Sequence, residues 1–357
     1  MKKRHGKISI FTLCIVSILT IILMTIVLSV RVQAKAPYYE EKLSASERTA
    51  RAFSTIKNAV DSLHIPIDRI NDPNQTGLIG LQFSPLTIER GDITVKLTAT
   101  NPNIAAMVVH LLKRAQINAG DTVAVYLTGS TPALNTAAII ALETVGAIPI
   151  IIASIGSSMW GANYPELTIL DIERILWGND IISSRTAFAS IGGHDETGRG
   201  FSPEGRTLID SCLVRNGIPL LKVNDINDAI DKYVDVYTTD QNIHAFISIS
   251  EQPSGVSGFD HPPGIIFSNR IKEGPGLIPY FSRNGIPVIH LTQIHQLAME
   301  YGLPIAPVPL PGVGEGKLYH EYRNSVVLAV IFLLLLCVVL FFMLRYDLDA
   351  LLRRRGI

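Results

Sequence analysis

Two long apolar runs, one near each end of the chain, limit what this sequence can fold into. The first extends from Ile8 to Val30 and the second from Ser325 to Leu344, and neither contains a charged residue. About 20 helical residues cross the hydrocarbon core of a bilayer, and a surface helix of a soluble protein would carry a polar face. We therefore predict one transmembrane helix at each end, over residues 8–30 and 325–344.

The charges that flank the two runs predict an orientation. Basic residues occupy both short tails: Lys2, Lys3, Arg4, Lys7, Arg345, Arg353, Arg354 and Arg355. Short, positively charged flanks stay in the cytoplasm, so we expect a two-pass protein with both termini inside and the segment 31–324 outside. The alternative for the first run is a signal peptide, because Val32-Gln33-Ala34 has the small-residue pattern of a cleavage site.

The runs and the pattern between them divide the chain into seven segments. The predicted order is a cytoplasmic tail (1–7), a transmembrane helix (8–30), an amphipathic juxtamembrane helix (31–66), an extracytoplasmic α/β domain (67–302), a Pro/Gly-rich linker (303–324), a second transmembrane helix (325–344) and a basic cytoplasmic tail (345–357).

The net charge of the outer segment excludes one class of partner. Of the 31 basic and 31 acidic residues, 23 and 29 fall in the outer segment, which leaves it with a charge of −6. An acidic domain is poorly suited to nucleic acid. Cys212 is the only cysteine in this segment, so an internal disulfide is excluded there.

Short apolar strands alternate with helices through the outer domain. A helix over Pro132–Val145 lies between expected strands at Thr122–Leu127 and Ile148–Ala153. Further strands are expected at residues 186–191, 220–223, 244–250 and 288–291. Such alternation predicts an α/β fold with a mostly parallel, doubly wound (Rossmann-like) sheet and helices on both faces.

Ligands of open α/β sheets bind beyond the carboxyl ends of the strands, and this rule selects the candidate residues. Small hydroxyl residues and glycines beside a helix N-terminus suit an anion, although each could be an ordinary helix cap. Arg199 could offer its guanidinium to a carboxylate or phosphate, or the loop that holds it could be a solvated connection. The ligand-binding candidates are Thr128, Gly129, Ser130, Thr131, Gly156, Ser157, Ser158, Trp160, Asn163, Gly192, Gly193, His194, Asp195 and Arg199.

Several catalytic and cofactor classes lack their motifs. A serine nucleophile needs a base within hydrogen-bond reach, and His194-Asp195 offers the only candidate base at the same edge as Ser130. No Gly-x-Ser-x-Gly elbow, metal-binding spacing or nucleotide-binding glycine loop occurs. We therefore expect no metal and no cofactor, and we assign no catalytic residue.

Several strings in the outer domain resemble the poly-gamma-glutamate system protein family. The strings lie at 72–80, 100–103, 156–163 (GSSMWGAN), 198–206 (GRGFSPEGR) and 285–291, and the match runs through most of residues 45–319. The resemblance implies a bacterial cell envelope and a role in making or exporting poly-γ-glutamate, with no established reaction. In that family a Gly-Gly turn follows the penultimate strand, whereas Ser248-Ile249-Ser250-Glu251 stands here.

Three hypotheses for function follow. The first is an accessory component, anchored in the bacterial cell membrane beside other membrane subunits of the poly-γ-glutamate machinery. The second is an enzyme, an amide hydrolase or transferase, that acts on the γ-glutamyl polymer. The third is a sensor that binds a small carboxylate.

Overall fold

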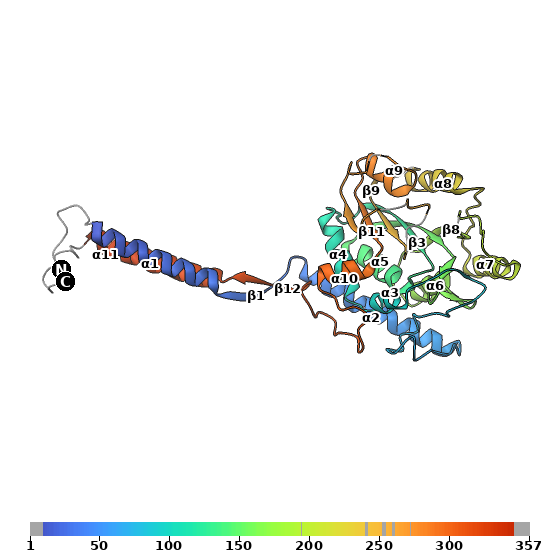
Figure 1. The fold of residues 1–357 in the computed structure, drawn as a ribbon, viewed down its shortest axis with the longest axis horizontal. Helices are drawn as coiled ribbons and strands as arrows, with labels where there is room; N and C mark the ends of the chain where they lie inside the picture. Colours follow the sequence, from blue (N-terminus) through green and yellow to red (C-terminus); the bar gives the residue numbers. More distant parts are fainter. Residues whose placement is uncertain are drawn as a thin grey trace. The chain divides into compact units, whose positions relative to one another are not determined.

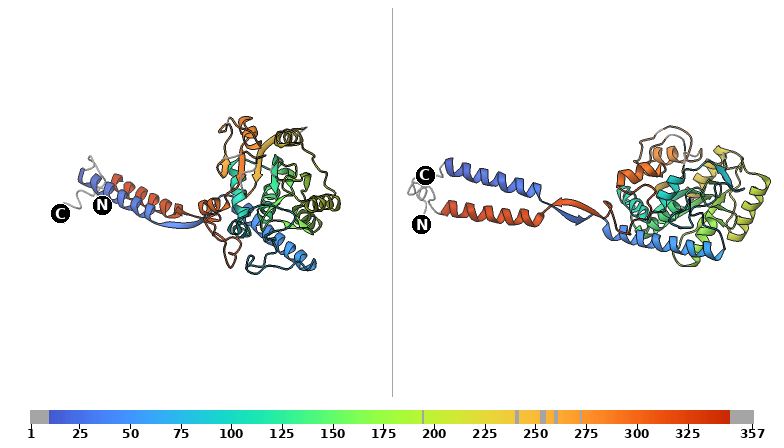
Figure 2. Two further views of the ribbon diagram at one scale, coloured as in Figure 1. Left: turned by 45° about the vertical axis from the view of Figure 1, so that its right-hand side comes forward. Right: turned by 60° about the horizontal axis from the view of Figure 1, so that its bottom comes forward.

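The computed structural model describes residues 10–193, 195–239, 242–251, 255–258, 261–271 and 273–345. The chain forms two compact units (Figures 1 and 2). The first, the terminal unit, combines the two chain ends up to Ala36 and from His320, and the second, the central domain, comprises Pro37–Tyr319.

The terminal unit contains two apolar helices and a short two-stranded ribbon. Helix α1 (Ile10–Ser29) leads into strand β1 (Arg31–Lys35), and strand β12 (His320–Asn324) leads into helix α11 (Val326–Arg345). Strands β1 and β12 pair antiparallel. Among the described residues, α11 is the one helix that is long and apolar enough to cross a membrane.

A six-stranded sheet forms the centre of the second unit. Its strands, in spatial order, are β10 (Gly264–Ile266), β11 (Val288–Leu291), β9 (Ile243–Ile249), β3 (Thr122–Thr128), β4 (Ile148–Ser154) and β8 (Thr186–Ser190). All neighbours pair parallel except β10, which runs antiparallel to β11. The predicted α/β class with a mostly parallel sheet is confirmed.

Nine helices and two small two-stranded ladders complete the described part of the central domain. The helices are α2 (Tyr39–Ser62), α3 (Ile93–Ala99), α4 (Ile104–Arg114), α5 (Pro132–Val145), α6 (Ile169–Gly178), α7 (Pro203–Asn216), α8 (Ile226–Thr238), α9 (Leu277–Arg283) and α10 (Ile294–Tyr301). The ladders join β2 (Thr87–Glu89) to β5 (Ser157–Ser158), and β6 (Asn163–Tyr164) to β7 (Leu167–Thr168).

The side chains of β3 alternate between two hydrophobic cores. Val125 and Leu127 face the core that α2, α4 and α5 complete, whereas Tyr126 faces the core of α8 and α9. Figure 1 shows α8 and α9 on one side of the sheet and α4 and α5 on the other. Because both faces are covered, the central strands are apolar without alternation, as their sequence indicated.

The order of the strands reverses once. From β3 the chain adds β4 and then β8 on one side, and it then returns to place β9 and β11 on the other side of β3. The carboxyl ends of β3 and β9 therefore flank the point at which the winding changes direction, where open α/β sheets hold their ligands.

The strand expected at residues 220–223 does not form. Leu220 makes only an isolated bridge to Ala189 of β8, flanked by hydrogen bonds from Ala189 N to Pro219 O (3.0 Å) and from Leu221 N to Ala189 O (2.8 Å). Strand β8 is the edge of the sheet, and the chain leaves this edge for α8, whose first turn Asp225 caps. The expectation was wrong because an apolar run after a glycine turn does not specify how many of its residues pair with the neighbouring strand.

The Pro- and Gly-rich segment 303–316 belongs to the central domain, where it is bound by Thr98 of α3 and by Asn103 at the start of α4. The Asn103 side chain donates to Gly312 O (2.9 Å) and accepts from Gly314 N (3.1 Å). Thr98 Oγ1 accepts a hydrogen bond from Ala306 N at 3.0 Å. These bonds hold the segment although it has no secondary structure of its own.

Candidate functional site

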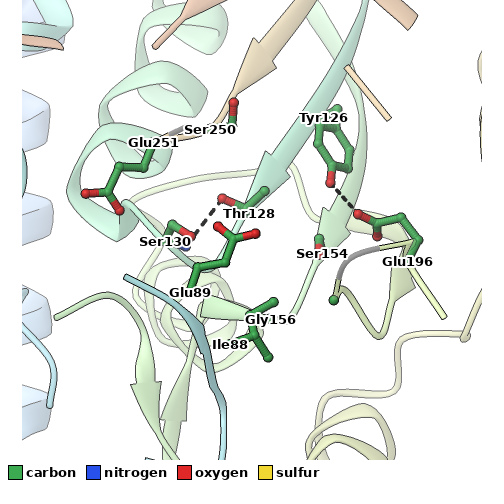
Figure 3. A pocket seen from close by; sticks show the side chains of 11 residues that line it. Ile88, Glu89, Tyr126, Thr128, Ser130, Ser154, Gly156, Glu196, Ser250 and Glu251 are labelled. Carbon is green, nitrogen blue, oxygen red and sulfur yellow. Dashed lines mark hydrogen bonds between the residues drawn. The ribbon is translucent and has the colours of Figure 1, made fainter. Parts of the chain in front are cut away.

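A small cavity lies where the carboxyl ends of β3, β4, β8 and β9 converge (Figure 3). Its volume is about 40 Å³. It is lined by Ile88, Glu89, Tyr126, Thr128, Ser130, Ser154, Gly156, Gly193, Glu196, Ser250 and Glu251. Hydroxyls and carboxyls dominate this lining, which makes the cavity suited to a small polar group rather than to an apolar ligand.

A buried ion pair supports one side of the cavity. Helix α3, which Asp92 caps, carries Lys96, and its Nζ lies 2.5 Å from Glu251 Oε2. The two side chains are only 1% and 4% exposed. Lys96 Nζ also donates to Ser158 Oγ at 2.7 Å and to the backbone oxygen of Ser130. The pair thus links α3 to the loops that follow β3, β4 and β9.

The carboxylate of Glu251 is further fixed by its neighbours. Asp92 N donates to Oε1 at 2.6 Å, and the hydroxyl of Ser158 donates to Oε2. Burial lowers the pKa of Lys96, and the adjacent Glu251 carboxylate opposes this shift. Two charges taken from water in this way need both partners, because either one alone would be a costly buried ion.

A second buried carboxyl, Glu196, lines the cavity from the loop after β8. It accepts hydrogen bonds from Tyr126 (2.7 Å), from Tyr233 (3.0 Å) and from Ser190. Burial raises the pKa of Glu196, and the hydroxyl donors partly offset that effect. Its backbone has φ of 61°, a left-handed conformation that is uncommon for a residue other than glycine and that occurs often at functional sites.

The loop 156–163 forms the frame beside Ser130. Ser158 N donates to Ser130 Oγ at 3.1 Å, and Ser157 Oγ donates to Gly129 O at 3.1 Å. Asn163 binds both the N–H and the carbonyl of Leu81, at 2.8 and 2.7 Å. These bonds set the positions of the loop backbones and leave little room, since a side chain at Gly80 would come within 1.9 Å of the Gly161 oxygen.

The predicted ligand-binding residues fall into two groups around this cavity. Thr128, Ser130, Gly156 and Gly193 line it. The remaining members of the 128–131 and 156–163 loops surround that lining without reaching it. They are Gly129, Thr131, Ser157, Ser158, Trp160 and Asn163. The two strand–helix loops are therefore close together, with only part of each facing the cavity.

The predicted Gly-rich loop 192–200 contributes Gly193 to the lining, together with Glu196, which was not among the predicted residues. Arg199 forms an ion pair with Asp195, and the Arg199 side chain is 73% exposed. Gly192 pairs with Thr197 in an isolated bridge beside the cavity. The interpretation of Arg199 as part of a solvated loop fits this arrangement. His194 lies outside the described residues.

Sequence reasoning did not select the acidic groups of the cavity. Glu196 stood within the expected Gly-rich loop, and Glu251 directly follows the expected strand of β9, so the position beyond a strand end could have selected both. Lys96 gave no such signal, because a lysine in a helix is usually solvent-exposed.

One lining hydroxyl has no partner. Ser250 is 3% exposed, and its Oγ makes no hydrogen bond within the described structure. Buried polar groups are nearly always satisfied, so an exception at a cavity wall marks a position that a ligand or water can fill. No cluster of His, Cys, Asp and Glu among the described residues could hold a metal ion.

Comparison with known proteins adds no identity to this geometry. No protein-family model, curated protein or solved structure matches the chain.

Proposed function

We propose that this chain is a membrane-anchored, extracytoplasmic component of a bacterial poly-γ-glutamate synthesis or export system, whose central domain binds a small polar ligand. The observation that carries the binding role is the cavity at the change of winding direction, with the buried carboxyls of Glu196 and Glu251 in its wall. The poly-γ-glutamate setting rests on the five sequence strings that resemble that family.

The membrane arrangement in this proposal has two passes. Helix α11 is long and apolar enough to span a bilayer, and α1 contains 20 residues without a charge. The basic residues of the tails favour both termini in the cytoplasm and residues 31–324 outside. A reporter that works only outside the cytoplasm should then be active when fused at Gly316 and silent after Ile357. The reverse pattern would refute the orientation.

The cell test for the ligand-binding role uses two buried glutamates. Glu196→Gln removes an ionisable carboxyl from the cavity and should lower polymer production several-fold in a producing bacterium. Glu173→Gln is the matched control, because Glu173 is also buried but binds Thr186 away from the cavity. Normal polymer from the Glu196→Gln protein, at wild-type abundance in the membrane, would exclude the cavity from the function.

The anchor is tested separately. Removing residues 325–357 should reduce polymer production, because tethering raises the effective concentration of the domain near its membrane partners. Full production by a truncated protein that is still secreted and folded would show that the second apolar helix is dispensable.

An enzyme that acts on the γ-glutamyl polymer is the second candidate function. The observation in its favour is that Glu251 is ion-paired with Lys96, whereas burial raises the pKa of Glu196 in the same cavity. Two carboxyls in unlike environments can divide the roles of general base and general acid. Such an enzyme would cleave or transfer γ-glutamyl amide bonds.

A direct assay distinguishes the enzyme from the accessory component. Purified full-length protein in detergent is incubated with poly-γ-glutamate, and new chain ends are counted. An accessory component produces no new chain ends. In cells, the Ser130→Ala and His194→Ala variants of an accessory component should leave most polymer production intact. A serine-dependent hydrolase would instead lose several orders of magnitude in rate when its nucleophile is replaced.

A further inference from the structure

Carboxyl groups outnumber cationic side chains in the described lining of the cavity. Glu89, Glu196 and Glu251 reach it from three separate segments of the chain. Within the described part of the chain no lysine, arginine or histidine lines it, and the nearby Lys96 is already paired with Glu251. The cavity therefore disfavours an anionic ligand and attracts a cationic one, because like charges repel strongly where water is excluded.

Glu196 shows the imbalance most clearly. Its carboxyl accepts hydrogen bonds from the hydroxyls of Tyr126, Ser190 and Tyr233, and no described cationic side chain lies within 4.0 Å of it. Burial without a cation raises the pKa of this carboxyl, and a positive charge beside it would favour the ionised form. A cation from the ligand would provide that charge.

The hydrogen-bonding capacity of the wall points to the kind of cation. The unpartnered hydroxyl of Ser250 and the hydroxyls of Thr128 and Ser130 lie on the same wall as the carboxyls. An ammonium group has three donors and no acceptor, so it complements hydroxyl and carboxyl oxygens. A metal ion lacks its ligand set, since no metal-binding cluster is present among the described residues.

The size of the cavity limits the ligand. A water molecule needs roughly 10–15 Å³ of such volume, and the cavity offers about 40 Å³. It can therefore hold a head group of a few heavy atoms, while the remainder of a larger ligand would extend outside. An amino acid would enter with its ammonium group and would have to keep its carboxylate out of the cavity.

We propose that the cavity recognises a small primary ammonium group, held by Glu196 and Ser250 at the carboxyl ends of β8 and β9. This inference rests on the proposed ligand-binding function and names the chemical class of the ligand. It differs from the third hypothesis from the sequence, a sensor for a small carboxylate, in naming a ligand of opposite charge.

Isothermal titration calorimetry of the full-length protein in detergent tests the chemical class. Three probes of similar size are compared: ethanolamine, which carries an ammonium group, neutral ethylene glycol, and anionic glycolate. Ethanolamine should bind, and the other two should not. Binding of glycolate or glycol as tightly as ethanolamine would overturn the ammonium assignment, as would the absence of ethanolamine binding.

Three variants test the location of binding. Glu196→Gln should weaken ethanolamine binding by about tenfold or more, the usual value of a hydrogen bond to a charged partner. Ser250→Ala should weaken it by a smaller factor, and Glu173→Gln should leave it unchanged. Unaltered ethanolamine affinity in both cavity variants would overturn the proposal. If Glu196→Gln does not fold, Ser250→Ala decides, because its hydroxyl has no partner in the protein.

The two proposals fail in different experiments. Loss of polymer in Glu196→Gln cells, together with a purified protein that ignores ethanolamine, would sink the ammonium class and leave the ligand-binding role standing. If the purified protein binds ethanolamine but Glu196→Gln cells make normal amounts of polymer, the ammonium class stands and the role of the cavity in polymer production falls.

Discussion

Two buried polar clusters of the central domain contain an ion pair, yet only one of them adjoins the cavity. In the first, Asp171 accepts hydrogen bonds from Arg215 (2.5 Å), Asn216 (2.9 Å) and Thr168 (2.7 Å), and it ties α6 to the end of α7. In the second, Lys96 pairs with Glu251, whose side chain lines the cavity. Each of the two clusters lies in the interior.

The difference lies in what remains unsatisfied. Burial alone would raise the pKa of Asp171, but the donors from Arg215, Thr168 and Asn216 reverse the shift and hold it below its ordinary value. The carboxylate of Asp171 is satisfied by these donors, and its interactions join α6 to α7. The cavity cluster adjoins an orphan hydroxyl at Ser250 and a carboxyl without a cation at Glu196. Burial of charge is therefore a weaker sign of a site than an unfilled bonding capacity beside it.

The largest expected effect is the loss of one partner of the cavity pair. Lys96→Met should destabilise the protein by about 3–5 kcal/mol, because Glu251 would be left buried without its cation. The double variant Lys96→Met/Glu251→Gln should recover part of that loss. Urea unfolding in detergent measures both values. Equal stability of the single and double variants would show that the pair does not act as a unit.

A pH-dependent stability is expected from a third buried carboxyl, Glu173. Burial raises its pKa from 4.5 to about 7. The folded chain therefore keeps a proton that the unfolded chain releases, so this contribution to stability is complete below pH 4.5 and declines as the pH rises to 7. The difference between the two pKa values corresponds to about 3 kcal/mol in the free energy of unfolding.

Glu173→Gln removes this titration. The stability of the variant, measured by urea unfolding between pH 4.5 and 7, should decline less than that of the wild type over this range. Identical pH profiles of the two proteins would contradict the assignment. The test sharpens the comparison because Glu173, like Asp171, is buried outside the cavity and should not affect ligand binding.

The smallest effects separate two serines of the cavity cluster. Ser158→Ala should cost about 1–2 kcal/mol, because its hydroxyl bonds both Lys96 and Glu251. Ser250→Ala should change stability by no more than about 0.5 kcal/mol, since its hydroxyl has no partner to lose. Thermal unfolding of the two variants side by side provides the measurement. A cost at Ser250 equal to that at Ser158 would contradict an open bonding position.

Local signals predicted the main elements of the fold. Helix α5 and strand β11 occupy the expected residues, because Pro132 opens the first and the Gly285-Ile286-Pro287 turn begins the second. Strand β10, which adds antiparallel at the edge of the sheet, was not expected, because its three residues are too few to form a pattern.

The candidate site was less visible in the sequence. The rule for strand ends drew attention to the loops containing Ser130 and Ser158, which the structure brings together through a hydrogen bond. It could not show that Lys96 is buried or that Glu251 pairs with it, because the two are 155 residues apart in sequence. Nor does sequence reveal that Glu196 adopts a left-handed backbone or that the hydroxyls of Tyr126, Ser190 and Tyr233 bind its carboxyl.

The β1–β12 ribbon has a consequence for proteolytic processing. Ala34, the last residue of the predicted cleavage pattern, pairs with Glu321, and its neighbours Gln33 and Lys35 are paired as well. Enzymes that grip a substrate as an added strand need its backbone N–H and carbonyl groups, and here the opposite strand already occupies many of them. A peptidase that cleaved after Ala34 would therefore have to act before the two strands meet. The order of synthesis gives it that opportunity, since residues 320–324 emerge from the ribosome nearly 300 residues after Ala34.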